Sequence, residues 1–199
     1  AVDEAIADCF ANPEDLEGKN LLIRNVLQEL TRRVLQLDEK DAPLEIVQLE
    51  KWENYRFALD EQRSVILGGF IDRVDRLADG LRVIDYKTGK VYFKGVKNPE
   101  DVFTDTSHKE QFQATLYAYL ISKRFQGEPV KVGLITLREM SEGIKYLDKG
   151  VPATPQSLQV FESGLRGLLS NLFNPDIPFH QTEDLSQCTY CSFKDVCGR

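Results

Sequence analysis

Residues 65–87 constrain this chain more than any other segment, because they have the pattern of two strands joined by a tight turn. Apolar, strand-like runs lie on either side of Asp79-Gly80, a strong two-residue turn signal. A loop centred there places Asp72 opposite Lys87, with Asp85 as the diagonal neighbour. Side chains two apart on a strand share a face, and so do cross-strand partners. The pattern therefore predicts that the two aspartates and the lysine converge.

Such a cluster has two interpretations. Two carboxylates held close together repel each other unless a cation lies between them, and hard carboxylate oxygens suit Mg²⁺ or Mn²⁺. Strand-end carboxylates in ordinary salt bridges would show the same spacing. The convergence thus suggests a divalent metal site, and the spacing alone does not decide between the two.

The order of expected elements predicts an α/β fold with a mixed central β-sheet flanked by helices. The whole chain, 1–199, is expected to form one domain, with 180–199 as a cysteine-containing tail. The expected elements are a helix over 20–38 capped by Asn20, strands over 44–49, 55–59, 65–74 and 81–86, a polar loop over 88–108, a helix over 111–125, strands over 130–137 and 144–147, and a helix over 155–173.

The balance of charge limits the possible partners. A formal net charge of −7 argues against a free-standing electrostatic binder of nucleic acid, although acidic residues around a metal would contribute to it. Lys90, Lys94 and Lys97 follow the hairpin and are candidates for contacting a DNA backbone; a solvated loop is the other interpretation. No apolar run has membrane-spanning length and no signal pattern opens the chain, so a cytoplasmic protein without membrane contact is expected.

The residues around the turn carry a family resemblance. The sequence GGFIDRVD leads into the turn and VIDYKTG follows it. This resembles the RecB-type branch of the PD-(D/E)XK nuclease superfamily. The resemblance implies that Asp72 and Asp85 bind Mg²⁺ or Mn²⁺, that Lys87 is the catalytic lysine and that the carbonyl of Tyr86 is a further ligand. It also suggests Glu50 as an added metal contact, although a surface glutamate fits as well.

The same resemblance implies an activity, the hydrolysis of DNA phosphodiesters in repair or recombination, with exonuclease action expected. Arg73 and Asp75 are expected to form a structural pair rather than to act in catalysis. Gln113 and Tyr117 lie four apart on the expected helix and so share a face. The RecB branch carries a Gln and a Tyr with this spacing, which adds both to the expected site, with Gln111 as a substitute. An amphipathic helix packing on the core is the alternative.

Three cysteines form a second cluster, Cys188, Cys191 and Cys197. Thiolates this close together in a cytosolic protein indicate metal binding, and zinc would need a fourth ligand such as His180. AddB-type nucleases and CRISPR-associated adaptation nucleases have a similar spacing. The resemblance implies a [4Fe-4S] cluster completed by an upstream cysteine. Cys9 is the other cysteine of the chain.

Two features depart from the family pattern. No histidine precedes Asp72, and Cys9 is not followed by proline. We interpret the chain as a C-terminal part of a helicase-nuclease or repair protein, with an incomplete cluster, a helicase domain or subunit as partner, and uncertain activity in isolation. The alternatives are a stand-alone CRISPR-associated adaptation nuclease that uses Cys9, and a catalytically incomplete DNA-binding or structural module.

Overall fold

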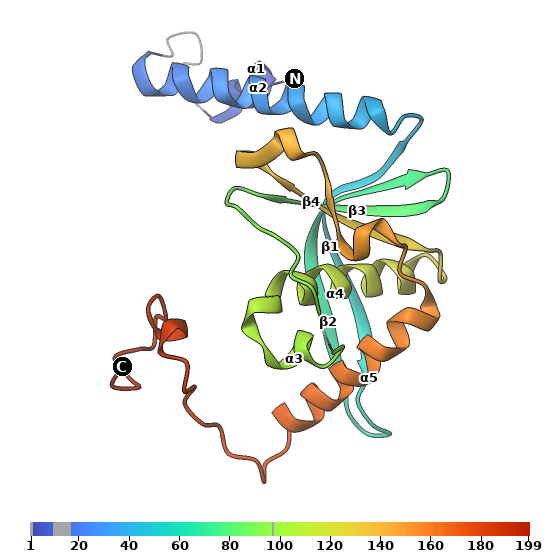
Figure 1. Cartoon of the computed structure of the whole chain (residues 1–199), viewed down its shortest axis with the longest axis vertical. Helices are drawn as coiled ribbons and strands as arrows, with labels where there is room; N and C mark the ends of the chain where they lie inside the picture. The colour runs from blue at the N-terminus through green and yellow to red at the C-terminus, as the bar shows by residue number, and fades with distance from the viewer. Residues whose placement is uncertain (1, 10–16, 97) are drawn as a thin grey trace.

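A computed structural model describes residues 2–9, 17–96 and 98–199 of the chain, without the side chain of Cys9. A five-stranded sheet lies between helices on both faces (Figure 1). The strands follow the order β1-β2-β3-β4-β5, and β3 and β4 are parallel while the other neighbours are antiparallel. The predicted α/β fold with a mixed sheet is confirmed.

The elements have the following bounds: α1 Val2–Cys9, α2 Gly18–Lys40, β1 Glu45–Ala58, β2 Ser64–Leu77, β3 Gly80–Lys87, α3 Asp101–Thr104, α4 Lys109–Arg124, β4 Val130–Thr136, β5 Lys145–Tyr146 and α5 Pro155–Leu172. Short 3₁₀ turns cover Thr106–His108, Leu137–Glu142, Leu147–Gly150 and Leu185–Cys188. Residues 173–199 otherwise form an irregular tail.

The alternation of side chains along β3 builds a core on each face of the sheet. Val83 packs into the core formed with α4 and α5, whereas Ile84 packs with Leu37 of α2 on the opposite face. On α4 the positions that enter the first core recur at helical spacing, namely Ala114, Tyr117, Ala118 and Ile121. The sheet is therefore fixed from both sides.

Ionic contacts also hold α2 on its face of the sheet. Asp75 is fully buried and accepts hydrogen bonds from Arg73 Nε at 2.6 Å and from Arg82 Nη2 at 2.8 Å. Each arginine reaches a second carboxylate at the end of α2: Arg73 contacts Asp38 at 2.8 Å, and Arg82 contacts Asp41. Burial alone would lower the pKa of both arginines, but hydrogen bonds raise it above the ordinary value, with Asp38 and Asp75 for Arg73 and with Tyr146 and Asp75 for Arg82. Arg73 and Asp75 thus form a structural pair, as predicted.

The register predicted for the hairpin is wrong. The observed pairs run from Arg73–Ile84 to Leu77–Gly80, so the two turn residues are Ala78 and Asp79. A Cβ on Gly80 would lie 2.6 Å from the carbonyl oxygen of Pro129, which accepts a hydrogen bond from the backbone N of Leu81. The glycine therefore permits the close approach of the segment that leads into β4, and the turn lies one residue earlier than expected.

Three other expectations require correction. The predicted strands 44–49 and 55–59 are one continuous strand, β1, which passes through a left-handed residue at Glu50 with φ 45°. Asn20 lies inside α2, whose N-cap position is Glu17 and has no side-chain cap. The loop 88–108 contains α3 and a 3₁₀ turn.

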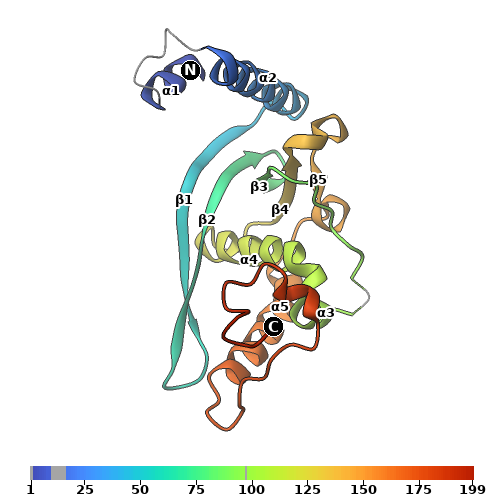
Figure 2. The same ribbon diagram turned by 90° about the vertical axis from the view of Figure 1, so that its left-hand side faces the viewer.

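Figure 2 shows β1 and β2 as a long two-stranded ribbon that continues beyond β3. Within the described part of the chain, no helix has both the length and the apolar character needed to cross a membrane.

Candidate active site

The candidate site lies at the fork where β2 separates from β3. The pairing of these strands starts at Arg73–Ile84, so the next residues of β3 no longer meet a backbone partner on β2. The backbone N of Tyr86 instead donates to Asp72 Oδ2 at 2.8 Å. A carboxylate thus takes the place of a ladder carbonyl, and this bond fixes Asp72 beside the end of β3.

Asp85 is the buried carboxylate of the pair. Its residue is 5% exposed, and its Oδ2 lies 2.8 Å from Lys87 Nζ but accepts no well-aligned hydrogen bond. Burial raises the pKa of the Asp85 carboxyl, the ammonium of Lys87 opposes the rise, and the charges of Asp72 and Glu110 add to it. The hydrogen bond from Tyr86 N holds Asp72 next to Asp85, the residue that precedes Tyr86 in β3.

A chain of hydrogen bonds joins β3 to α4. Lys87 Nζ donates to Gln113 Oε1 at 2.9 Å, and Gln113 Nε2 donates to Tyr117 Oη at 2.8 Å. Since Tyr117 Oη accepts from the amide, its own hydrogen is free to be donated. Burial raises the pKa of Tyr117, so the phenol stays protonated at neutral pH. The five residues predicted as catalytic therefore form one group.

The donor set suits a divalent cation. Asp85 Oδ2 is a buried oxygen with capacity for a further partner, and Asp72 Oδ2 is held nearby by the backbone. A cation between the carboxylates would relieve their repulsion, and oxygen ligands are what Mg²⁺ and Mn²⁺ prefer. The described residues include no group of three or more His, Cys, Asp or Glu arranged to hold a metal. A metal here would therefore need backbone, water or phosphate oxygens as well.

Glu50 and the carbonyl of Tyr86 were also predicted to contact the metal. Glu50 lies in β1 between the paired positions Leu49–Arg73 and Lys51–Ile71, hence beside Asp72 in the ladder, but its side chain is exposed. The hydroxyl of Tyr86 lies 3.4 Å from Arg73 Nη1 in the α2-side network. The predicted role of the Tyr86 carbonyl stays a prediction.

Two residues near the site were not predicted from the sequence. Glu110 in the first turn of α4 raises the pKa of Asp85 through its charge, and it lies three residues before Gln113, a spacing that shares a helix face. His108 occupies the N-cap position of the same helix without a side-chain cap; it is 6% exposed and its Nδ1 has no hydrogen-bond partner. The helix spacing could have revealed Glu110, whereas the burial of His108 depends on tertiary packing.

The lysines proposed to contact DNA are not equivalent. Lys90 Nζ forms an ion pair with Glu139 at 2.8 Å, and Glu139 also binds Lys145 and accepts from Tyr92 Oη. These contacts attach the loop after β3 to the 3₁₀ turn that follows β4. Lys94 is exposed, and Lys97 lies outside the described residues.

The tail places the three cysteines in successive turns. Cys188 and Cys191 are half-buried and Cys197 is exposed, all as free thiols. The backbone N of Cys191 donates to the carbonyl of Cys188, and the backbone N of Phe193 donates to Cys191 Sγ at 3.4 Å. His180 is exposed. The cluster proposed for these thiols is untested by this geometry.

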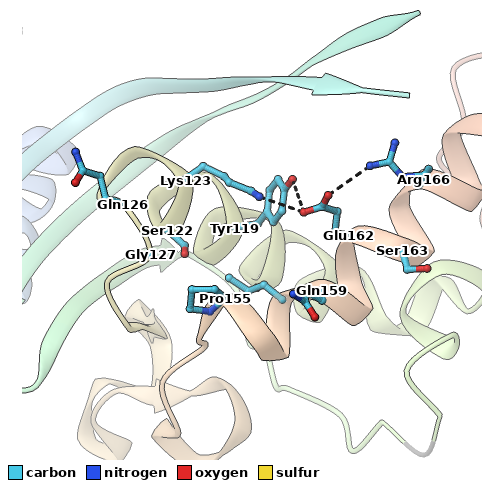
Figure 3. A pocket seen from close by; sticks show the side chains of 11 residues that line it. Tyr119, Ser122, Lys123, Gln126, Gly127, Pro155, Gln159, Glu162, Ser163 and Arg166 are labelled. Atoms are coloured by element: carbon cyan, nitrogen blue, oxygen red, sulfur yellow. Dashed lines mark hydrogen bonds and ion pairs between the residues drawn. The ribbon is translucent and has the colours of Figure 1, made fainter. Parts of the chain in front are cut away.

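A cleft between α4 and α5 lies apart from the candidate site (Figure 3). Glu162 is its central charge and contacts Tyr119, Lys123 and Arg166 at 3.0, 3.2 and 3.4 Å. Because Tyr119 and Lys123 lie in α4 and Glu162 lies in α5, these contacts join the two helices.

Comparison with known proteins identifies a family for the chain. A family model described as the PD-(D/E)XK nuclease superfamily matches residues 1–198. No curated protein matches the chain. Similar solved structures include one reported as "Crystal structure of SSO0001", with 12% identity, coverage of 98% of this chain and 94% of that one, and a TM-score of 0.42.

Proposed function

Because the chain belongs to the PD-(D/E)XK nuclease superfamily, we propose that it is a metal-dependent deoxyribonuclease whose reaction centre is the Asp72, Asp85 and Lys87 group. The observation that supports this most directly is the position of Lys87, which forms an ion pair with Asp85 and donates a hydrogen bond to Gln113. Purely structural ion pairs would not need a lysine held between a buried carboxylate and an amide that is itself oriented by a tyrosine.

The residues have distinct roles in the proposed reaction. Asp72 and Asp85 would hold Mg²⁺ or Mn²⁺, which when bound polarises the scissile phosphate. Lys87 carries a positive charge at a fixed position and stabilises negative charge that develops on the phosphate oxygens. Gln113 orients the ammonium. Tyr117 orients the amide through its oxygen and can donate its remaining hydrogen to a phosphate oxygen.

Cleavage of an end-labelled DNA oligonucleotide in Mg²⁺, Mn²⁺ or EDTA tests the proposal. Lys87→Ala should lower the rate by about 10²–10³-fold, the loss typical of a donor that stabilises the transition state. Lys131→Ala is the matched control, since this lysine pairs with Asp79 at the turn end of the same hairpin. Metal-dependent cleavage that Lys87→Ala leaves unchanged would refute the assignment. DNA binding without cleavage would favour the incomplete binding module.

We also propose the finer context that the hairpin motif suggests, an AddB/RecB-like exonuclease in DNA repair with a helicase domain or subunit as partner. Exonuclease action requires an end, so linear DNA should be degraded and circular single-stranded DNA should resist. Nicking of the circle would contradict this. Purification of the native protein from cells, with identification of what accompanies it, tests the helicase partner.

For the tail, we propose that Cys188, Cys191 and Cys197 supply three thiolates to a [4Fe-4S] cluster. Support comes from their spacing and from the backbone N–H donated to Cys191 Sγ, since such hydrogen bonds tune cluster sulfurs. Anaerobic purification should give bound iron, because such a cluster is held by cysteine thiolates. Zinc without iron would contradict the cluster and favour a zinc site.

A further inference from the structure

The last residue of β4 lies beside Lys87 on the face of the sheet that α4 covers. β3 and β4 are parallel, and residues paired across parallel strands project from the same face. Val83 pairs with Val132, and both belong to the core formed with α4. Lys87 pairs with Thr136 an even number of residues further along, so both side chains lie on that same face. Since neighbouring strands are about 5 Å apart, the threonine is directly next to the proposed catalytic lysine.

The hydroxyl of Thr136 is buried and has no hydrogen-bond partner. The residue is 0% exposed, and its Oγ1 neither donates nor accepts a hydrogen bond. It occupies the N-cap position of the 3₁₀ turn Leu137–Glu142, where a threonine commonly accepts from a backbone N–H, but it provides no such cap. Val130 and Val132 occupy the same face of β4 without any polar group. An unpartnered buried hydroxyl destabilises a fold, so valine would suit this position better unless the hydroxyl has another use.

Lys87 has a reason to need a further acceptor. Its Nζ lies 2.8 Å from Asp85 Oδ2 and donates to Gln113 Oε1 at 2.9 Å. Asp85 Oδ2 is also the buried oxygen that the proposed site offers to a divalent cation. A divalent cation and an ammonium that share one carboxylate oxygen repel each other strongly. An ammonium displaced from Asp85 keeps its bond to Gln113 and has to direct another hydrogen to a different acceptor.

We infer that Thr136 is a positioning residue for Lys87, and that its hydroxyl accepts a hydrogen from the ammonium when a divalent cation occupies Asp85 Oδ2. This inference rests on the proposed nuclease function and specifies how the lysine is held during the reaction. The hydroxyl on the neighbouring strand is within reach of the flexible lysine side chain, which can turn while it keeps its bond to Gln113. The lysine thus retains two fixed acceptors, and its third hydrogen is free for a phosphate oxygen.

Binding of Mn²⁺ alone, followed by electron paramagnetic resonance of the free ion, tests the inference without DNA and without cleavage. Thr136→Val removes the hydroxyl and keeps the shape of the side chain. The displaced ammonium then has no acceptor, so the Kd for Mn²⁺ should rise about 10-fold, in the range of a hydrogen bond to a charged group. Thr136→Ser, which retains the hydroxyl, should restore most of the affinity. A Kd for Thr136→Val equal to that of wild type would overturn the inference.

A double-mutant cycle with Lys87→Ala separates this role from a general effect of the substitution. Without the ammonium the hydroxyl has nothing to hold, so Thr136→Val should leave the Mn²⁺ affinity of Lys87→Ala unchanged. The same loss in both backgrounds would show that Thr136 acts on the metal independently of Lys87, which contradicts the inference. Ser122→Ala is the control, because this buried serine lies about 14 Å along α4 from Gln113 and its loss should not change Mn²⁺ affinity.

Stability without metal distinguishes a positioning hydroxyl from a structural one. Urea unfolding in EDTA should show Thr136→Val to be as stable as wild type or more stable, because the substitution removes a buried polar group that has no partner. A large loss of stability in EDTA would identify the hydroxyl as part of the fold and would refute its role toward Lys87. In excess Mn²⁺, kcat for DNA cleavage should fall in Thr136→Val with an unchanged KM, since the lysine acts on the transition state.

The failures of this inference and of the proposed nuclease function are distinguishable. Mn²⁺ binding that Thr136→Val weakens, in a protein that does not cleave DNA, would support the role of Thr136 and refute the reaction. Metal-dependent cleavage together with wild-type Mn²⁺ affinity in Thr136→Val would do the reverse.

Discussion

The buried carboxylate of Asp75 offers the sharpest test of how this fold is held together. Both of its oxygens are occupied: Oδ1 accepts from Arg73 Nε at 2.6 Å, and Oδ2 accepts from Arg82 Nε at 3.0 Å and Nη2 at 2.8 Å. Asp75 and Arg82 are each 0% exposed and Arg73 is 3% exposed. Asp75→Ala therefore leaves two buried guanidinium groups without their shared partner.

The expected loss follows from these contacts. Three charge-assisted hydrogen bonds at about 1.5–3 kcal/mol each would suggest about 5–9 kcal/mol. Arg73 keeps Asp38 and Arg82 keeps Asp41, so the smaller value typical of a broken buried pair applies, about 4 kcal/mol. In a chain of this size that lowers the melting temperature by about 8–16 °C.

Urea unfolding followed by circular dichroism measures the change in the free energy of unfolding. The matched control is Asp79→Ala, whose carboxylate is 58% exposed and pairs with Lys131, so it should change stability by less than about 1 kcal/mol. Asp75→Asn, which keeps one acceptor oxygen, should lie between the two and provides the value if the alanine variant does not fold. A loss below about 1 kcal/mol for Asp75→Ala, with an unchanged denaturant slope, would refute the reasoning.

Two further predictions concern the site and its surroundings. A Cβ on Gly69 would lie 2.9 Å from Tyr117 Cε1, so Gly69→Ala should displace the tyrosine and lower the cleavage rate. Gly95→Ala is the control, because a Cβ on Gly95 meets nothing within 4 Å. Equal cleavage rates of the two variants would contradict the proposed role of Tyr117. Hydrogen bonds from Lys145, Lys90 and Tyr92 lower the pKa of Glu139 to about 2 from 4.5. Because the pKa of Glu139 is depressed in the folded protein, these contacts stabilise the fold above pH 4.5, and this stabilisation is lost as the pH falls toward 2. The NMR shifts of the Tyr92 ring should therefore remain constant from pH 7 to 5. In Glu139→Gln these shifts should differ from wild type already at pH 7.

The hairpin shows why part of the site was predictable despite a wrong register. The expected pairing put Asp72 opposite Lys87, and the observed register is displaced by two residues. Because side chains along a strand alternate with a period of two, a displacement by two keeps every residue on its face. The convergence of Asp72, Asp85 and Lys87 was therefore predictable, although the turn was not.

Other features depend on contacts that a local pattern does not contain. Gly80 looked like a turn residue, whereas its lack of a Cβ permits the approach of Pro129. Glu50 adopts φ 45° inside β1, and pairing with β2 continues on both sides of it, so the two expected strands are one. Arg82 is a charge within an apolar run, and only the fold shows that it meets Asp75.

The architecture explains how the proposed reaction centre can be held accurately at the fork of two strands. Productive catalytic geometry has to be kept within about 0.5 Å, which requires support for the residues that carry it. Alternate residues of β3 provide that support. Arg82 and Ile84 are held on the α2 side of the sheet. On the other side Val83 packs toward α4, and Asp85 forms an ion pair with Lys87, which donates a hydrogen bond to Gln113 of α4. Since β3 cannot shift toward one face without breaking contacts on the other, the buried arginine network stabilises the position of Asp85, the carboxylate proposed to be catalytic, without touching it.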